Sequence, residues 1–159
     1  MIDNELIVGA LQERGEVDIE TFSAEETIQS GGAIAQLLRA GDVVALFGDL
    51  GSGKTTLIKG IVAGLGATEN VSSPTFTIQH QYRGATVMIY HFDFYRIDTP
   101  QGLRSIGCEE FFDGDGICLV EWPERANDLL PPQRWEIHLK QPPGVSTHRQ
   151  ISVRRRTSS

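Results

Sequence analysis

The chain has 159 residues, a mass of 17.5 kDa and a formal net charge of −7 at pH 7. This length suits one domain with a sizeable core, and the acidic balance argues against a protein that binds DNA or RNA over a broad basic face. We see no apolar run of the roughly 20 residues that a membrane helix needs, and no signal peptide. Because the two cysteines lack metal-ligand spacing, we expect reduced thiols and a cytoplasmic protein.

The amino-terminal part of the chain is weakly patterned. Residues 1–20 allow only a marginal helix, so we expect an N-terminal extension there, a folded domain over residues 21–153 and a basic tail over residues 154–159. Within the domain, Ser23 and Glu26 fit a capping box that begins a helix, and Gly41 is expected to end it. The buried face of this helix is expected to comprise Ile28, Ile34, Leu37 and Leu38.

The next segment combines a strand, a glycine-rich loop and a helix in that order. Residues 43–47 are apolar and rich in β-formers, and residues 55–65 space their apolar side chains as a helix does. Between them runs Gly48-Asp49-Leu50-Gly51-Ser52-Gly53-Lys54-Thr55-Thr56. This run matches G-x-x-x-x-G-K-[ST], the phosphate-binding P-loop. It predicts that the protein binds a nucleoside triphosphate.

The P-loop pattern assigns a role to each part of the motif. Glycines let backbone N–H groups converge on the phosphates, and the helix N-terminus adds a favourable dipole. Lys54 is expected on the β- and γ-phosphates and the Thr55 hydroxyl on Mg²⁺.

The remaining elements define the fold class. Residues 76–82 and 86–92 flank an Arg83-Gly84 turn and predict an antiparallel hairpin. Thr99-Pro100 starts a helix that runs towards Phe112. Residues 117–120 predict a buried strand, and residues 135–139 and 150–153 a terminal strand pair. We therefore expect an α/β protein, a single P-loop NTPase domain with a mixed parallel and antiparallel sheet flanked by helices.

Two acidic residues end apolar strands, which is where a P-loop enzyme needs a carboxylate for Mg²⁺ and its water shell. They are Asp93 and Glu121. Mg²⁺ takes one or two carboxylates directly, so one acid could touch the ion or its water while the other orients the attacking water. The residues leave open which acid does which. Residues 71–77 suit either a segment that senses the γ-phosphate or a serine–proline turn.

Four motifs in series make the chain similar to a known family. The P-loop run, Ser73-Pro74-Thr75-Phe76-Thr77, His91-Phe92-Asp93-Phe94-Tyr95-Arg96 and Glu121-Trp122-Pro123-Glu124 together resemble the bacterial TsaE (YjeE) family. The resemblance runs from about Phe22 to Val153. It implies a small ATPase of the pathway that makes N6-threonylcarbamoyladenosine at position 37 of tRNAs reading ANN codons.

The resemblance also implies partners and site residues. It implies that the chain alone hydrolyses ATP slowly and that it acts with a complex of two partner proteins, TsaB and TsaD. In that complex the ATPase cycle would reset the modifying enzyme between turnovers. It implies ATP and Mg²⁺ as ligands, with tRNA reached through the partners. Carried over by motif, Gly48 to Thr56 bind phosphates, Lys54, Asp93 and Glu121 are essential, and Thr55 and Glu121 serve the metal. Thr75 lies in the switch-like segment, and Trp122 lies near the nucleotide or a partner.

Several alternatives stay open at this stage. Arg96 and Arg125 follow the candidate acids closely enough to approach phosphates, although surface arginines are common. His91 is placed as a strand residue, and such a residue is more often packed or hydrogen-bonded than catalytic. A small-molecule kinase is disfavoured because no arginine-bearing lid follows the P-loop, and a GTPase because no Asn-Lys-x-Asp sequence is present. A nucleotide-sensing interaction module is a further alternative.

Overall fold

The computed structural model describes residues 2–72, 79–126, 128–144 and 146–157. The described elements, in chain order, are α1 (Asn4–Arg14), β1 (Glu16–Thr21), α2 (Ala24–Ala35), β2 (Val43–Phe47), α3 (Lys54–Gly64), β3 (Gln79–Arg83), β4 (Met88–Asp93), α4 (Pro100–Ile106), α5 (Cys108–Phe112), β5 (Ile117–Glu121), the 3₁₀ helix η1 (Pro123–Ala126), β6 (Arg134–Lys140) and β7 (Arg149–Arg156).

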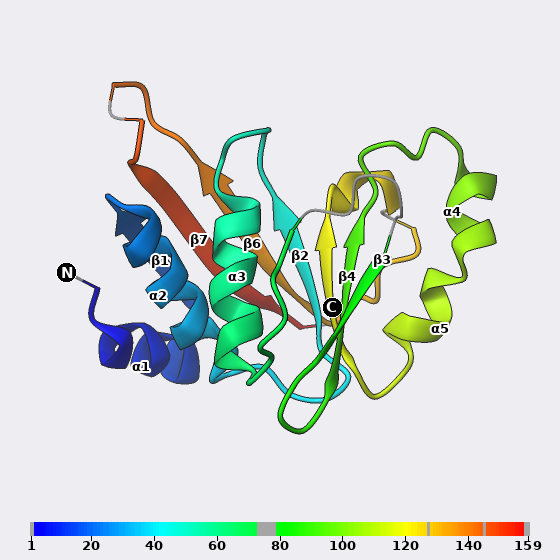
Figure 1. Cartoon of the computed structure of the whole chain (residues 1–159), viewed down its shortest axis with the longest axis horizontal. Coiled ribbons are helices and arrows are strands. Elements are labelled where there is room, and N and C mark those ends of the chain that lie inside the picture. Colours follow the sequence, from blue (N-terminus) through cyan, green and yellow to red (C-terminus); the bar gives the residue numbers. More distant parts are fainter. Residues whose placement is uncertain (1, 73–78, 127, 145, 158–159) are drawn as a thin grey trace.

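One mixed sheet organises the molecule (Figure 1). Its seven strands follow the order β1-β7-β6-β2-β5-β4-β3. The central strands β6, β2, β5 and β4 pair in parallel, whereas β3 on β4, β7 on β6 and β1 on β7 are antiparallel. The mixed sheet predicted from the sequence is therefore confirmed. The P-loop strand β2 lies between β6 and β5.

Two hydrophobic cores cover different amounts of the sheet. The larger core packs α1, α2 and α3 against one face, with Ile34, Leu57 and Ile137 among its buried side chains. The smaller core lies on the other face, where α4, α5 and η1 cover β2, β4 and β5. All five residues of β5 are buried, whereas burial alternates along β6. Strands covered on both faces are apolar throughout, and strands covered on one face alternate.

Helices α2 and α3 approach each other through glycine. A Cβ added to Gly31 would collide with the backbone oxygen of Leu57, and one added to Gly60 with the backbone oxygen of Ile28. Only residues without a side chain allow two helices this close. Ile28, expected to be buried, is 36% exposed, although its backbone lies against Gly60 of α3.

The ends of α2 match the sequence at one side only. Ser23 Oγ accepts the Glu26 N–H at 3.1 Å, as the capping box predicts. The Glu26 carboxylate accepts the N–H of Phe22, one residue before the cap. The helix was expected to end at Gly41 but ends at Ala35. Tighter i→i−3 hydrogen bonds follow, including the Leu38 N–H to Ala35 O, and these turns carry the chain into β2.

Later elements follow the predicted order with one break. The helix expected from Thr99 towards Phe112 is two short helices, because Gly107 adopts a left-handed conformation with φ of 73°. The Thr99 side chain caps the first helix through the Gly102 N–H. Strand β3 starts at Gln79, and residues 73–78 of the expected hairpin lie outside the described residues.

The first and last strands of the chain pair with each other in the sheet. Residues 4–14 form α1, which buries Ile7 and Leu11, and β1 pairs with β7 at the sheet edge. Residues 154–156, expected as part of a basic tail, extend β7 with exposed side chains. The division of the chain at residues 20 and 153 stays a prediction.

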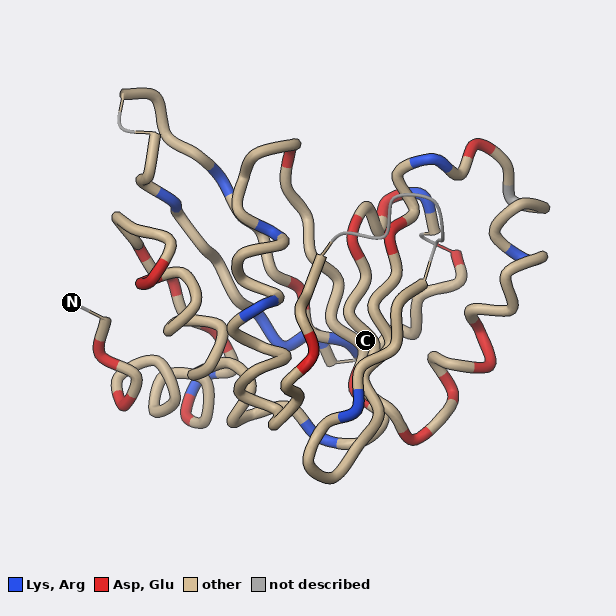
Figure 2. Tube along the Cα trace, viewed as in Figure 1, with Lys and Arg blue, Asp and Glu red and all other residues tan. Residues whose placement is uncertain are grey.

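Two further features of the described residues are the distribution of charge and the character of the helices. Acidic and basic positions are interspersed along the described trace (Figure 2). Within the described ranges, no helix is both long and apolar enough to cross a membrane.

Candidate nucleotide-binding site

The glycine-rich loop wraps around the start of α3. Gly51 and Gly53 adopt left-handed conformations with φ of 81° and 102°, and Gly53 is the N-cap of α3. These conformations favour glycine because they bring a Cβ too close to the backbone in other residues. The predicted order of strand, loop and helix is therefore present. Ser52 Oγ is buried and, among the described residues, has no hydrogen-bond partner. An unsatisfied polar atom inside such a loop fits an anion-binding site.

Lys54 is the cation of this loop, and its side chain is folded back on the protein. It is only 6% exposed. Its Nζ donates to the backbone oxygen of Gly48 at 2.5 Å. Burial lowers the pKa of Lys54, while the charges of Glu121 and Asp93 act in the opposite direction. The ammonium group therefore sits within the field of several carboxylates, of which Glu121 and Asp93 act most strongly.

Trp122 covers the same ammonium group. The Lys54 nitrogen lies 4.0 Å from the centroid of the Trp122 ring, a cation–π contact. Trp122 directly follows β5, has φ of 56°, and is the only non-glycine residue with positive φ in the described part of the chain. Such a conformation costs roughly 1–2 kcal/mol for an L-residue. Local strain of this kind often accompanies functional sites. The ring also contacts Tyr95, at 4.8 Å between centroids.

The two predicted acids end adjacent strands. Asp93 and Glu121 are Cα partners in the parallel pair of β4 and β5, so both project from the same edge. Asp93 Oδ1 accepts the Tyr95 N–H at 2.9 Å. Burial is the main cause that raises the pKa of Asp93, and Glu121 adds to it, while the Tyr95 hydrogen bond, His91 and Lys54 oppose it. The structure therefore brings together Lys54 and both carboxylates.

Glu121 has a buried partner in His91, a strand residue that the sequence predicts to be packed or hydrogen-bonded. His91 Nε2 lies 2.7 Å from Glu121 Oε2, and the two residues are 0% and 3% exposed. Tyr82 in turn places its hydroxyl 3.3 Å from His91 Nδ1. The sequence holds one signal for the contact between His91 and Glu121. His91 stands two residues before Asp93, and alternate residues of a strand share a face, so His91 is expected on the face that carries the acids.

The oxygen-bearing side chains beside the loop suit Mg²⁺ better than they suit a metal ion whose ligands all come from the protein. In the described ranges there is no group of three or more His, Cys, Asp or Glu side chains that could hold a metal ion. Mg²⁺ keeps several waters and is usually held by one or two carboxylates together with substrate phosphates. Asp93, Glu121 and the half-buried Thr55 at the start of α3 fit that pattern.

A small cleft continues from the loop towards the β6–β7 connection, and the sequence analysis did not identify it. Its volume is about 100 Å³, and it is lined by Ser23, Ala24, Thr27, Gly53, Thr56, Ser146, Thr147 and Arg149. The Arg149 side chain lies against the loop, since a Cβ on Gly53 would be 3.2 Å from Arg149 Nε. No sequence motif marks Arg149, because its approach to the loop depends on the strand order.

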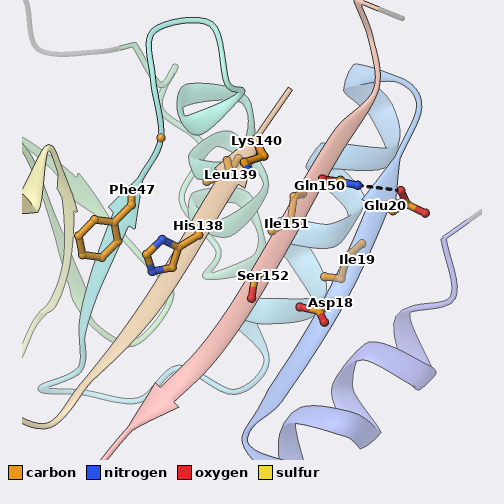
Figure 3. A pocket seen from close by; sticks show the side chains of 11 residues that line it. Asp18, Ile19, Glu20, Phe47, His138, Leu139, Lys140, Gln150, Ile151 and Ser152 are labelled. Atoms are coloured by element: carbon orange, nitrogen blue, oxygen red, sulfur yellow. Dashed lines mark hydrogen bonds between the residues drawn. The ribbon is translucent and has the colours of Figure 1, made fainter. Parts of the chain in front are cut away.

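A larger groove lies on the uncovered face of the sheet (Figure 3). Its volume is about 710 Å³, and β1, β6 and β7 supply most of its lining. Phe47 and His138 stack in it at 4.4 Å, and Gln150 donates to Glu20 across it. It reaches Gly48 but contains neither Lys54 nor the two acids. The groove therefore adjoins the phosphate loop at Gly48 but does not include the ammonium group or the two carboxylates.

The other predicted residues lie around the loop or outside the site. Asp49 and Leu50 are exposed at the loop's tip, Leu50 at 72%. Thr75 lies outside the described residues. Arg125 donates to the backbone oxygen of Ile97 and is 3.8 Å from Asp98, so it does not point at the loop as an arginine finger would. Arg96 is exposed.

The strand–loop–helix unit and the acids on neighbouring strands define a P-loop NTPase-type fold. A comparison with solved structures agrees: the crystal structure of YdiB from Bacillus subtilis matches with a TM-score of 0.76 and 35% sequence identity, over 89% of this chain and 86% of that one.

Sequence comparisons identify the family. Residues 21–151 match the model of the family described as threonylcarbamoyl adenosine biosynthesis protein TsaE, and the chain belongs to that family. A protein named tRNA threonylcarbamoyladenosine biosynthesis protein TsaE from Bacillus subtilis is 42% identical over 76% of this chain and 75% of its own length. A protein of the same name from Treponema pallidum is 40% identical over 74% of this chain and 87% of its own. The family recognised from the four motifs is therefore confirmed.

Proposed function

We propose that this protein is a Mg²⁺-dependent ATPase that supports the synthesis of N6-threonylcarbamoyladenosine at position 37 of ANN-decoding tRNAs. The observation that carries the proposal is the convergence of the Lys54 ammonium with the Asp93 and Glu121 carboxylates beside the glycine loop. The family name and the names of the relatives support the pathway.

In the proposed reaction the loop binds the triphosphate of ATP. The N–H groups from Gly48 to Thr56 surround the phosphates, and Ser52 Oγ gains the partner that it lacks in this structure. Lys54 leaves Gly48 O and the Trp122 ring and donates to β- and γ-phosphate oxygens. Because the site is buried, this charge stabilises the transferring phosphoryl group more than it would in water.

The carboxylates complete the site. We propose that Thr55 and Glu121 hold Mg²⁺, directly or through its water, and that Asp93 is the second essential carboxylate. When bound, the ion would neutralise charge on the phosphate oxygens. Asp93 keeps one oxygen engaged by the Tyr95 N–H, so its other oxygen is the one available to orient the attacking water.

The nucleoside half of ATP is assigned to the small cleft beside the loop. This cleft contains Gly53 and Thr56 and is therefore continuous with the phosphate site. The Arg149 guanidinium lies at the junction between the two. Residues from α2 and from the β6–β7 connection would contact the sugar or the base.

We further propose that the protein acts in the cytoplasm with TsaB and TsaD. The net charge of −7 disfavours direct capture of tRNA, so the partners would hold the tRNA while this chain hydrolyses ATP to reset them. Trp122 and the switch-like segment containing Thr75 are assigned to the nucleotide or partner side of the site.

The test is a reconstitution with TsaB, TsaD, tRNA and threonylcarbamoyl-adenylate, in which ATP hydrolysis and modified adenosine are followed over many turnovers. Lys54→Ala should abolish both, with Lys59→Ala, an exposed lysine of α3, as the matched control. Glu121→Gln should keep nucleotide binding but lose turnover, with the exposed Glu110→Gln of α5 as its control. If modification proceeds equally with Lys54→Ala, the ATPase assignment is wrong. Phosphate transfer to a small acceptor would indicate a kinase, and binding without turnover a nucleotide-sensing module.

A further inference from the structure

A buried chain of hydrogen bonds leads from the edge of the sheet to Glu121. The Tyr82 hydroxyl on β3 lies 3.3 Å from His91 Nδ1 on β4, and His91 Nε2 lies 2.7 Å from Glu121 Oε2 on β5. His91 is fully buried, and Tyr82 is 4% exposed. Three strands thus each contribute one side chain to a single polar path within an otherwise apolar core.

The hydrogens along this path can be assigned by counting donors and acceptors. An ionised carboxylate only accepts, so the hydrogen between His91 and Glu121 belongs to His91 Nε2. With its hydrogen on Nε2, a neutral His91 ring has only a lone pair at Nδ1 and accepts there. The one phenol hydrogen of Tyr82 is therefore left for a ring nitrogen, and His91 Nδ1 is the nearer of two, the other being His80 Nδ1 at 3.4 Å.

This assignment has a consequence for the orientation of Glu121. Tyr82 donating to Nδ1 leaves Nε2 as the donor, and Nε2 then holds Glu121 Oε2. One carboxylate oxygen is thereby engaged on the side of β4, and Oε1 is the oxygen left for a ligand. Without that bond, a 3%-exposed carboxylate would lack a donor for Oε2 and would rotate towards another one, such as the Lys54 ammonium.

We propose that His91, itself oriented by Tyr82, is a positioning residue that aims the Glu121 carboxylate at the magnesium–nucleotide complex. The inference rests on the proposed function, because it needs Glu121 as the metal-associated acid. Neither His91 nor Tyr82 touches the reacting atoms. Outer-shell partners of this kind typically change metal affinity or activity by about 10–100-fold when removed.

The test separates a positioning role from simple packing. His91→Phe keeps a flat ring but removes the donor, whereas His91→Gln places an amide N–H near the position of Nε2. His138→Gln, on the exposed face of β6, is the matched control. For each folded variant, ADP affinity is measured by calorimetry with Mg²⁺ and with EDTA, and kcat and KM for ATP are measured separately.

We expect His91→Phe to bind ADP in EDTA within about twofold of the parent, to lose the tightening that Mg²⁺ causes, and to lose kcat by about 10–100-fold. His91→Gln should recover most of both, and Tyr82→Phe should show a smaller loss of the same kind. If the Phe variant does not fold, the Tyr82→Phe measurement decides. An unchanged Mg²⁺ effect and kcat in the folded His91→Phe protein, or in Tyr82→Phe where only that variant folds, would overturn the inference. So would equal losses in the Phe and Gln variants.

Glu121→Gln, measured in parallel, separates this inference from the proposed function. A loss in Glu121→Gln without a loss in His91→Phe defeats only the positioning role. If Glu121→Gln itself keeps the Mg²⁺ effect and turnover, the assignment of Glu121 as the metal acid is wrong, and the positioning inference falls with it.

Discussion

The ammonium group of Lys54 rests on the indole ring of Trp122, with the nitrogen 4.0 Å from the ring centroid. The contact occupies the cation that the glycine loop is expected to present to phosphate. It also links the end of β5 directly to the start of α3, so nucleotide binding at the loop should be felt at Trp122.

The first prediction concerns tryptophan fluorescence. Adding ATP should change the emission of the wild-type protein, because Lys54 must leave the indole to reach the phosphates. Trp122→Phe should abolish the change. The only other tryptophan in the sequence, Trp135, is 2% exposed on β6, so Trp135→Phe should keep it. A nucleotide-dependent signal that survives in Trp122→Phe would come from Trp135 and would contradict the assignment of the change to the Lys54–Trp122 contact.

The second prediction tests the nucleoside cleft. Arg149→Ala should weaken ATP binding by about tenfold or more, since a hydrogen bond to a charged group contributes about 1.5–3 kcal/mol. Binding is measured by calorimetry with ATP and with inorganic triphosphate. The loss should be larger for ATP if Arg149 serves the nucleoside end. Arg154→Ala, on the same strand but exposed, should bind both ligands normally. Equal affinities for ATP in the two variants would remove Arg149 from the site.

The third prediction uses two adjacent glycines of α2. Gly31→Ala should destabilise the protein by about 1–3 kcal/mol or more, because its Cβ would meet the Leu57 backbone of α3, which cannot move independently. Gly32→Ala meets nothing within 4 Å and should instead stabilise by about 0.5–1 kcal/mol through helix propensity. Urea unfolding of both variants measures the difference. Similar stabilities would contradict the close approach of the two helices.

The fourth prediction concerns stability at alkaline pH. Burial, with a smaller contribution from Cys108, raises the pKa of the Cys118 thiol to about 12 from 9.0. The folded protein therefore keeps a proton that the unfolded chain releases above about pH 9. The contribution of Cys118 to stability is complete below that pH and falls as pH rises towards 12, by up to about 1.4 kcal/mol per unit.

This dependence is measured by urea unfolding of wild type and Cys118→Ala between pH 8 and pH 10.5. Subtracting the two curves cancels the other groups that titrate in this range. The wild type should lose stability relative to the variant as pH rises. A constant difference across the range would mean that the buried thiol ionises as readily in the folded protein as in the unfolded chain.

Local sequence was sufficient to identify the phosphate loop, the Ser23 cap and most strands. Each depends on neighbouring residues: left-handed φ values need Gly51 and Gly53, and a cap needs a hydroxyl three residues before a free amide. The C-terminal ends of α2 and α4 were not predictable in this way. Helix α2 gives way to successive i→i−3 turns after Ala35, and α4 ends where Gly107 adopts a left-handed conformation.

The sequence by itself determined a P-loop fold, its family and the residues able to bind phosphate and metal, because those are properties of contiguous motifs. Only the tertiary structure decided how the motifs meet. The parallel register of β4 and β5 places Asp93 beside Glu121. His91 and Glu121 are 30 residues apart in the sequence but share a hydrogen bond. Arg149 reaches the loop from near the carboxyl end of the chain. Such contacts depend on strand order and packing between distant segments, and no spacing within one segment encodes them.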